Sequence, residues 1–457
     1  MKKILHLAFY NKRGIALLAC LLIFTVSCKK YLDAKTDKQL VIPTSLSDAQ
    51  ALIDFYDQMN GFYPSLGNES DDDFYLLPNY FSSLNVNSRN HYTWAQEALD
   101  ETDWTYMYQV VLNANIAMET VDKLPSATKN SSAGKAVKGE AYFFRANAFY
   151  QLAEYYAVPY NKSTAGNLFG IPLRLSSDAT PVSTRASLAE TWQQIIADFK
   201  ASASLLPDVN APLSRPSKVA AYAGLARAYL DMGEYDLSGK YADSALQLHS
   251  DLINYNTLDS ASLYPFERYN AEVIFTSFTQ LTGMHLLTNY RVDTFLYASF
   301  DSNDLRRSLF FTSNGPGTVG FRGSYDGTQT IFNGMASDEL YLIRAECYAR
   351  LGDKDNAMDE LNKLLITRWA TGTFIPYTAA TADEALNIIL AERKKELILR
   401  GSRWFDLRRL NQDTRFAKTL MREENGTIYT LPPNDPRYTF LIPADVIKIT
   451  GMQQSTR

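Results

Sequence analysis

Three consecutive carboxylates, Asp71-Asp72-Asp73, are the residues whose type and spacing most directly suggest chemistry. A glycosidase needs two carboxyl groups that face each other across the scissile bond, one of them with a raised pKa. A calcium loop needs ligands at spaced positions and a glycine at the turn. Neighbouring acids on an exposed loop supply neither arrangement. We therefore expect a solvated loop, or hydrogen bonds that sugar hydroxyls donate to Asp72, and no catalytic residue.

Other catalytic and cofactor-binding patterns are missing from the sequence. The histidines beyond the first 27 residues, His91, His249 and His285, lack metal-ligand spacing. No nucleophile elbow, phosphate-binding loop or dinucleotide fingerprint occurs. Lys and Arg number 45 against 50 Asp and Glu, so the chain is acidic and has no electrostatic attraction to nucleic acid. The sequence predicts no enzyme, metal, cofactor or nucleic-acid partner.

Two long stretches without helical periodicity, residues 61–103 and 251–334, are rich in Tyr, Phe and Trp. Loops of that length are functional or disordered, and their aromatic content argues against disorder. Aromatic rings stack on sugar rings, while nearby Asp, Asn and Arg bind hydroxyl groups, and such mixed linings are usual for small ligands. Packing against the scaffold is the competing interpretation for each ring. The candidate ligand contacts, led by Trp94 and Tyr92 beside Arg89, are Asp72, Tyr75, Arg89, Tyr92, Trp94, Tyr290, Phe321 and Tyr325.

Paired helices are predicted to hold these two insertions in place. Tyr341, Ala345 and Tyr348 share one helix face, and Gly352 stands where a left-handed residue ends a helix. This spacing is the tetratricopeptide pattern, and it recurs around Tyr222–Gly233. The predicted fold is mainly α, a tetratricopeptide-like scaffold with long aromatic-rich loops and a few short strands. Its helical pairs are expected at about 104–158, 188–248 and 338–410, and its strands include Glu272–Thr279 and Thr294–Phe300.

Residues 1–27 have the features of an export signal. Basic residues precede an uncharged run, Gly14–Val26, which is too short to span a bilayer because a spanning helix needs about 20 residues. Ser27 before Cys28 resembles a lipoprotein processing site, with Cys28 as the acylated residue. Cys20 is the alternative, although too little apolar sequence precedes it. Residues 28–45 would then form a tether, and residues 46–457 a single domain.

The C-terminal third carries a characteristic order of motifs. Asp338–Glu346 (D-E-L-Y-L-I-R-A-E) precedes Glu392–Leu397 (E-R-K-K-E-L) and Gly401–Arg409 (G-S-R-W-F-D-L-R-R). We interpret the last segment as a packed corner with paired charges rather than a nucleic-acid groove. The order resembles the C-terminal signature of the SusD/RagB family, surface lipoproteins of Bacteroidetes-type bacteria that bind nutrients, mostly glycans.

The resemblance implies a location and two partners. The chain would be a non-catalytic, lipid-anchored protein exposed on the outer membrane, with Cys28 carrying the lipid. An oligosaccharide or other nutrient would be its ligand, and a SusC-like TonB-dependent transporter its protein partner. A second interpretation stays open, in which the aromatics are packing residues and the repeats organise an envelope complex, because tetratricopeptide arrays usually bind protein. The sequence does not name the ligand.

Overall fold

The computed structural model describes residues 43–279 and 282–457. The predicted signal segment, Cys20, Cys28 and nearly all of the tether lie outside these residues. Residues 44–457 group into one unit by their internal contacts. Within the described ranges, no helix combines the length and the apolar character that crossing a bilayer requires.

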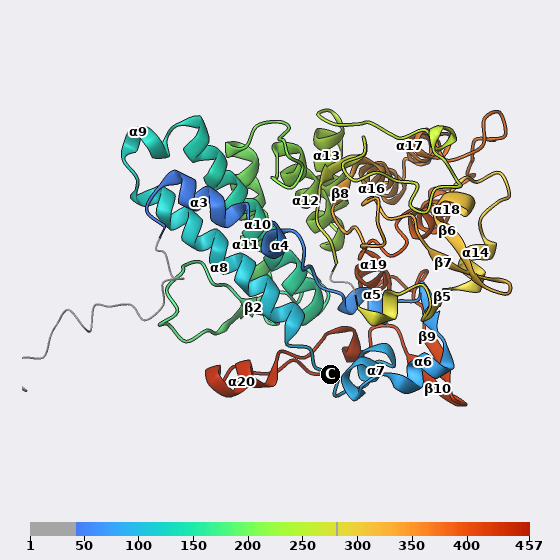
Figure 1. The fold of residues 1–457 in the computed structure, drawn as a ribbon, viewed down its shortest axis with the longest axis horizontal. Helices are drawn as coiled ribbons and strands as arrows, with labels where there is room; N and C mark the ends of the chain where they lie inside the picture. Colours follow the sequence, from blue (N-terminus) through green and yellow to red (C-terminus); the bar gives the residue numbers. More distant parts are fainter. Residues whose placement is uncertain (1–42, 280–281) are drawn as a thin grey trace, which may run out of the picture. The chain divides into compact units, whose positions relative to one another are not determined.

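Three long helices form the first part of the scaffold: α8 (Thr102–Lys123), α10 (Ser132–Tyr156) and α11 (Leu188–Leu205). α8 and α11 both pack along α10, and α3 (Leu46–Ile53) lies against α8 and α10 (Figure 1). Small residues of α10, among them Ala146, are fully buried between the aromatic side chains of the same helix. Because small residues let helix axes approach closely, α10 can be surrounded on most sides.

The tetratricopeptide-like helices form the second part, although a long insertion separates them in sequence. α12 (Lys218–Asp231) and α13 (Tyr235–Leu246) make one pair, and α16 (Ser337–Arg350) and α17 (Lys354–Leu365) make the next. α13 packs directly on α16, and α18 (Ala382–Glu396) packs on α16 and α17. Gly233 connects α12 to α13, and Gly352 connects α16 to α17. Their φ values are +71° and +88°, which glycine adopts without steric penalty. The interrupted array is therefore continuous in space.

Strands are short and occur in two-stranded antiparallel sheets. β1 (Phe74–Leu76) pairs with β5 (Tyr290–Val292), so Phe74 lies opposite Val292 and the two aromatic-rich insertions are joined. The prediction of a mainly α fold with a few short strands is confirmed. The other pairs are β2 (Phe169–Pro172) with β3 (Arg185–Ser187), β4 (Val273–Phe275) with β8 (Met335–Ala336), β6 (Phe311–Gly315) with β7 (Thr318–Phe321), and β9 (Leu420–Glu424) with β10 (Thr427–Leu431).

Both insertions contain more helix than their sequences predict. Thr294–Phe300, predicted as a strand, begins instead as α14 (Thr294–Ala298), because the Asp293 side chain accepts a hydrogen bond from the Leu296 N–H and caps the helix. The remaining short elements are α4 (Tyr56–Met59), α5 (Leu66–Ser70), α6 (Pro78–Ser83), α7 (Val86–Tyr92), α9 (Ser126–Lys129), α15 (Arg306–Leu309), α19 (Arg403–Leu410), α20 (Ala444–Thr450) and the 3₁₀ turns Tyr255–Thr257, Gly283–His285 and Pro436–Tyr438.

The insertions share an apolar core of their own. Phe74 and Tyr92 from the first insertion pack in one cluster with Phe266, Tyr290 and Phe311 from the second. Separate clusters fill the space around α8, α10 and α11 and between α16, α17 and α18. Much of the aromatic content that the sequence suggested for ligand binding is therefore used to hold the two insertions together.

Candidate functional site

The two leading candidates, Trp94 and Tyr92, lie in the interior. Their exposed fractions are 1% and 0%. The Arg422 guanidinium from β9 lies 3.7 Å from the Tyr92 ring centroid and 4.6 Å from that of Trp94. The Trp94 indole N–H donates to the Ser70 carbonyl at 2.8 Å. Arg422 lies against both rings, so both pack in the interior of this structure, and contact between them and a ligand stays a prediction.

The candidates of the second insertion are also part of the protein interior. Tyr290 and Tyr325 are each 2% exposed. The Phe321 N–H donates to the Tyr290 hydroxyl at 3.0 Å, and the Tyr325 hydroxyl donates to Glu272 at 2.8 Å. Phe321 itself is half-buried beside the aromatic core. Ring stacking by Tyr290 or Tyr325 on an external ligand is thus excluded in this conformation.

The acidic triplet is not a solvated loop. Asp71 and Asp73 are buried, and Asp72 accepts hydrogen bonds from Arg403 and Lys418, each at 2.6 Å. Lys394 lies at 3.1 Å from the same carboxylate. Burial opposes ionisation of Asp72, but the charges of Arg403 and Lys394 hold its pKa well below the usual value. The Asp72 carboxylate therefore contacts these three cationic side chains where the sequence predicted contact with water.

A pocket of about 420 Å³, here called the hairpin pocket, brings several predicted residues together. Its lining comes from the first insertion, from Asp293 and from β9, the first strand of the β9–β10 hairpin. Figure 1 shows the ribbons of β9, α6 and α7 near one another. Asp72, Tyr75, Tyr92 and Trp94 contribute to its wall, and Tyr75 is the half-buried aromatic among them. Arg89 is half-buried on α7 and does not line this pocket. Four of the predicted residues therefore lie around one pocket, although two of them, Tyr92 and Trp94, are buried.

A larger depression of about 740 Å³, here called the insertion cleft, lies where the two insertions meet α8. Its lining residues come from α5, α6 and α7, from the segment that leads into α8, and from the second insertion. Its lining is mostly polar and includes Tyr80, Asn85, Asn87, Ser88, Asp100, Glu101, Thr102 and Thr282, with Glu69, His91 and Asp103 more deeply placed. Side-chain amides and hydroxyls of this kind bind the hydroxyl groups of polar ligands.

Helix starts position both walls of the cleft. The Asn85 side chain accepts from the Ser88 N–H at 2.9 Å and begins α7. Asp100, one residue before the N-cap Glu101, accepts from the backbone N–H groups of Thr102 and Asp103 in the first turn of α8, at 2.6 and 3.0 Å. Sequence analysis missed these residues as site candidates, although Asn and Asp before a helix are recognisable capping signals.

Tyr80 is the aromatic residue that lines the cleft, and it depends on a glycine of the other insertion. A Cβ atom at Gly283 would lie 2.3 Å from the Tyr80 hydroxyl. Any larger residue there would displace the ring. The glycine thus fixes how the second insertion approaches α6.

The deeper part of the cleft contains a polar cluster around Glu69. His91 Nδ1 lies 3.5 Å from Glu69 Oε2, and the Ser65 hydroxyl donates to Oε1 at 3.2 Å. Burial opposes ionisation of Glu69, but the hydrogen bond and charge of His91 bring its pKa below the usual value. Asp103 differs, because burial raises its pKa well above the usual value although the N–H groups of Ser65 and Leu66 donate to it.

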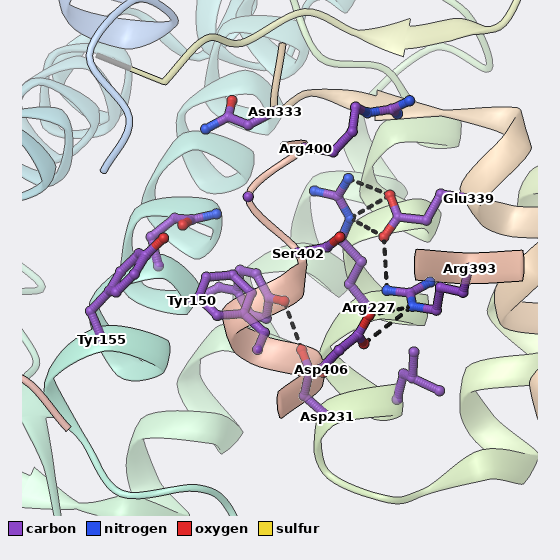
Figure 2. A pocket seen from close by; sticks show the side chains of 14 residues that line it. Tyr150, Tyr155, Arg227, Asp231, Asn333, Glu339, Arg393, Arg400, Ser402 and Asp406 are labelled. Carbon is purple, nitrogen blue, oxygen red and sulfur yellow. Dashed lines mark hydrogen bonds and ion pairs between the residues drawn. The ribbon is translucent and has the colours of Figure 1, made fainter. Parts of the chain in front are cut away.

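A third pocket is too small for a nutrient ligand. Its volume is about 20 Å³, which is room for one water molecule. Figure 2 shows ion pairs around it: Arg227 binds Glu339, and Arg393 binds Asp406, while Tyr150 donates to Asp231 at 2.6 Å. These contacts join α10, α12, α16, α18 and α19, so the cavity belongs to the scaffold.

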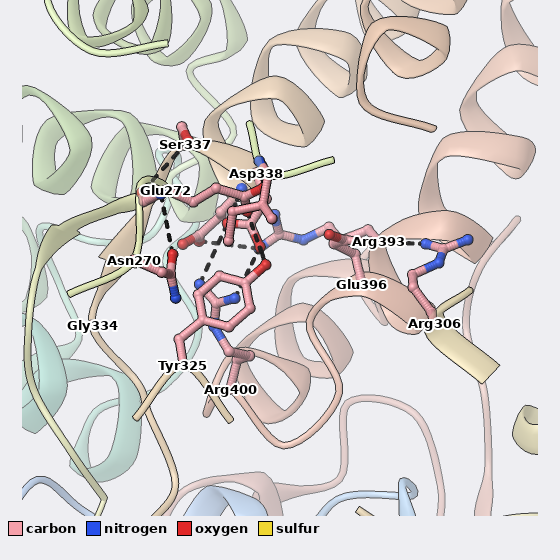
Figure 3. A network of polar contacts seen from close by, with 12 residues as sticks. Asn270, Glu272, Arg306, Tyr325, Gly334, Ser337, Asp338, Arg393, Glu396 and Arg400 are labelled. Atoms are coloured by element: carbon pink, nitrogen blue, oxygen red, sulfur yellow. Dashed lines mark hydrogen bonds and ion pairs between the residues drawn. The ribbon is translucent and has the colours of Figure 1, made fainter. Parts of the chain in front are cut away.

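Three buried carboxylates, Glu272, Asp338 and Glu396, lie close enough together to suggest a metal site (Figure 3). Arginines already balance their charges. Arg368 lies 2.8 Å from Glu272 and 2.7 Å from Glu396, and Arg400 lies 2.9 Å from Asp338. We therefore describe this group as a buried ion-pair network.

Comparison with known proteins gives two family matches. Residues 30–230 match a family described as starch-binding and associating with the outer membrane, and residues 338–444 match the SusD family. A SusD-like protein, P2, from Formosa agariphila is 24% identical over 375 residues, which is 67% of this chain and 71% of the relative.

Solved structures show the same fold. A SusD superfamily protein from Bacteroides thetaiotaomicron has a TM-score of 0.75 at 20% identity and covers 90% of this chain and 100% of its own. A putative sugar-binding protein from Bacteroides vulgatus has a TM-score of 0.73 at 20% identity, with 91% and 99% covered. A SusD-like carbohydrate-binding protein from the same species has a TM-score of 0.68 at 20% identity, with 89% and 96% covered.

Proposed function

Because the chain belongs to the SusD/RagB family, we propose that it is a non-catalytic protein that captures an oligosaccharide and delivers it to a SusC-like TonB-dependent transporter. Two solved relatives are named as sugar- or carbohydrate-binding proteins, which supports the ligand class. The proposal extends to the outer membrane as location, with a lipid on Cys28 as the anchor and the protein exposed to the medium.

The insertion cleft is the observation that carries the ligand proposal. Its volume, about 740 Å³, accommodates a short oligosaccharide, and amides and hydroxyls line both walls. Asn87 and Thr102 are exposed on opposite walls, and neither side chain is engaged by another residue of the described chain. Such groups are free to exchange water for sugar hydroxyls.

Glycan binding can be tested by native gel electrophoresis in the presence of soluble polysaccharides, followed by calorimetry. We expect the double variant Asn87→Ala/Thr102→Ala to bind about tenfold more weakly, because each lost hydrogen bond is worth roughly 0.5–1.5 kcal/mol. Both residues are exposed, so the variant should unfold at the same denaturant concentration. Tyr75→Ala serves as a matched change in the hairpin pocket. A loss of binding in Tyr75→Ala alone would move the ligand to that pocket.

The transporter proposal needs a separate experiment. Native protein would be isolated from detergent-solubilised outer membranes, and the co-purifying chains identified by mass spectrometry. A stoichiometric TonB-dependent barrel is the expected result. Recovery of the protein alone, or with periplasmic assembly factors, would contradict delivery to a transporter and favour a structural lipoprotein.

A further inference from the structure

The insertion cleft carries charge of one sign. The acidic residues that line it are Glu69, Asp100, Glu101 and Asp103, and no Lys or Arg lines it within residues 43–279 and 282–457. Positions 280 and 281, directly before Thr282, are the uncharged residues Gln280 and Leu281. His91 is the one lining residue of the described chain that can become cationic, and it lies against Glu69.

The four carboxylates differ in depth and in surroundings. Asp103 is buried and its raised pKa favours the neutral acid, whereas the lowered pKa of Glu69 favours the carboxylate. Asp100 and Glu101 lie at the rim, beside the N-terminus of α8. That helix end supplies only about half a positive charge. Among the described residues, the rim therefore carries two acidic side chains and no Lys or Arg.

From this charge distribution we propose that the cleft takes neutral or amino-bearing oligosaccharides and rejects glycans that carry sulfate or carboxylate groups. The inference rests on the proposed function and names the substrate class of that site. An anionic substituent in the cleft would lie among acidic side chains, and no guanidinium or ammonium group of residues 43–279 or 282–457 lines the cleft to receive it. Neutral hydroxyls and protonated amines meet acceptors instead.

The experiment compares polysaccharides of three charge classes under one condition of low salt. Laminarin, galactomannan and arabinan represent neutral glycans, chitosan oligosaccharides represent amino glycans, and carrageenan, alginate and polygalacturonate represent anionic ones. We expect retention by at least one neutral or amino glycan and by none of the anionic glycans. That binding should be weakened by Asn87→Ala/Thr102→Ala, which places it in the cleft.

Charge reversal gives the matched test. Glu101→Lys should raise binding of an anionic glycan at least about tenfold, because one repulsive contact becomes attractive. Asp355→Lys makes the same change of charge on α17, outside the cleft, and should have no such effect. Equal gains in both variants would show a non-specific effect of net charge and would overturn the inference.

The remaining outcomes separate the two proposals. If the unmodified protein binds a sulfated or uronate glycan and Asn87→Ala/Thr102→Ala weakens that binding, the site is a glycan site and the charge inference is wrong. If no glycan binds, or if binding is unchanged in the double variant, glycan capture by this cleft fails and the inference fails with it.

Discussion

Two groups of carboxylates in this protein have opposite surroundings. Glu272 and Glu396 lie in the interior, where Arg368 contacts both at less than 3 Å. Asp100 and Glu101 lie at the rim of the insertion cleft, where neither Lys nor Arg of the described residues lines the wall. A buried charge must be compensated inside the protein, whereas a rim carboxylate is compensated by water and remains available to a ligand. The first group therefore stabilises the fold, and the second can influence ligand choice.

Removing the guanidinium of Arg368 should have the largest effect on stability. Arg368→Met leaves two buried carboxylates without their shared cation, and breaking such pairs costs about 3–5 kcal/mol. Chemical denaturation would measure the loss. Arg415→Met is the control, because Arg415 makes its ion pairs while 47% exposed and pairs of this kind contribute about 1 kcal/mol or less. Similar losses in both variants would contradict the distinction between the two groups.

Glu140 is a buried carboxylate whose hydrogen-bond donors are side-chain amides instead of arginines. Gln50 donates to it at 2.8 Å and Asn210 at 3.2 Å, and burial raises its pKa to about 7. The folded state thus keeps a proton that the unfolded chain releases above about pH 4.5. The stabilising contribution of the protonated group is present below pH 4.5 and is lost as the pH rises through about 7.

The pH dependence gives a measurable difference between two proteins. From pH 5 to pH 8, the unfolding free energy of the unmodified protein should fall by about 2–3 kcal/mol relative to that of Glu140→Gln. Denaturant titrations at four pH values would measure both curves. If the two curves of unfolding free energy against pH are parallel, the prediction is wrong, and water or a conformational change stabilises the ionised Glu140 in the folded protein.

The smallest stability effect is expected at the cleft rim. Glu101→Gln should change the free energy of unfolding by less than about 0.5 kcal/mol, because the residue is exposed and its side chain does not cap α8. Denaturant titration at neutral pH is the measurement. A loss above about 1 kcal/mol would show that this carboxylate, like the buried group, has a structural role.

Sequence patterns predicted the scaffold well, because the relevant contacts are local. Tyr341, Ala345 and Tyr348 lie on one helix of a pair that Gly352 joins, as their spacing indicated. The paired charges around α19 also agree with the interpretation of that segment as a packed corner: Asp406 accepts from Arg393 at 2.9 Å. Asn85 and Asp100, which lie just before α7 and α8, are signals in the sequence from which two segments that line the cleft could have been predicted.

The paired helices and the resemblance to the SusD/RagB family could be predicted from local sequence patterns. The exposure of each aromatic face, in contrast, follows from contacts between distant parts of the folded chain. Arg422 lies over Tyr92 and Trp94, and Arg403 binds Asp72, although each partner is distant in the chain. Helical spacing is a local property of the chain, but the exposure of a ring or a carboxylate depends on what the rest of the chain places against it.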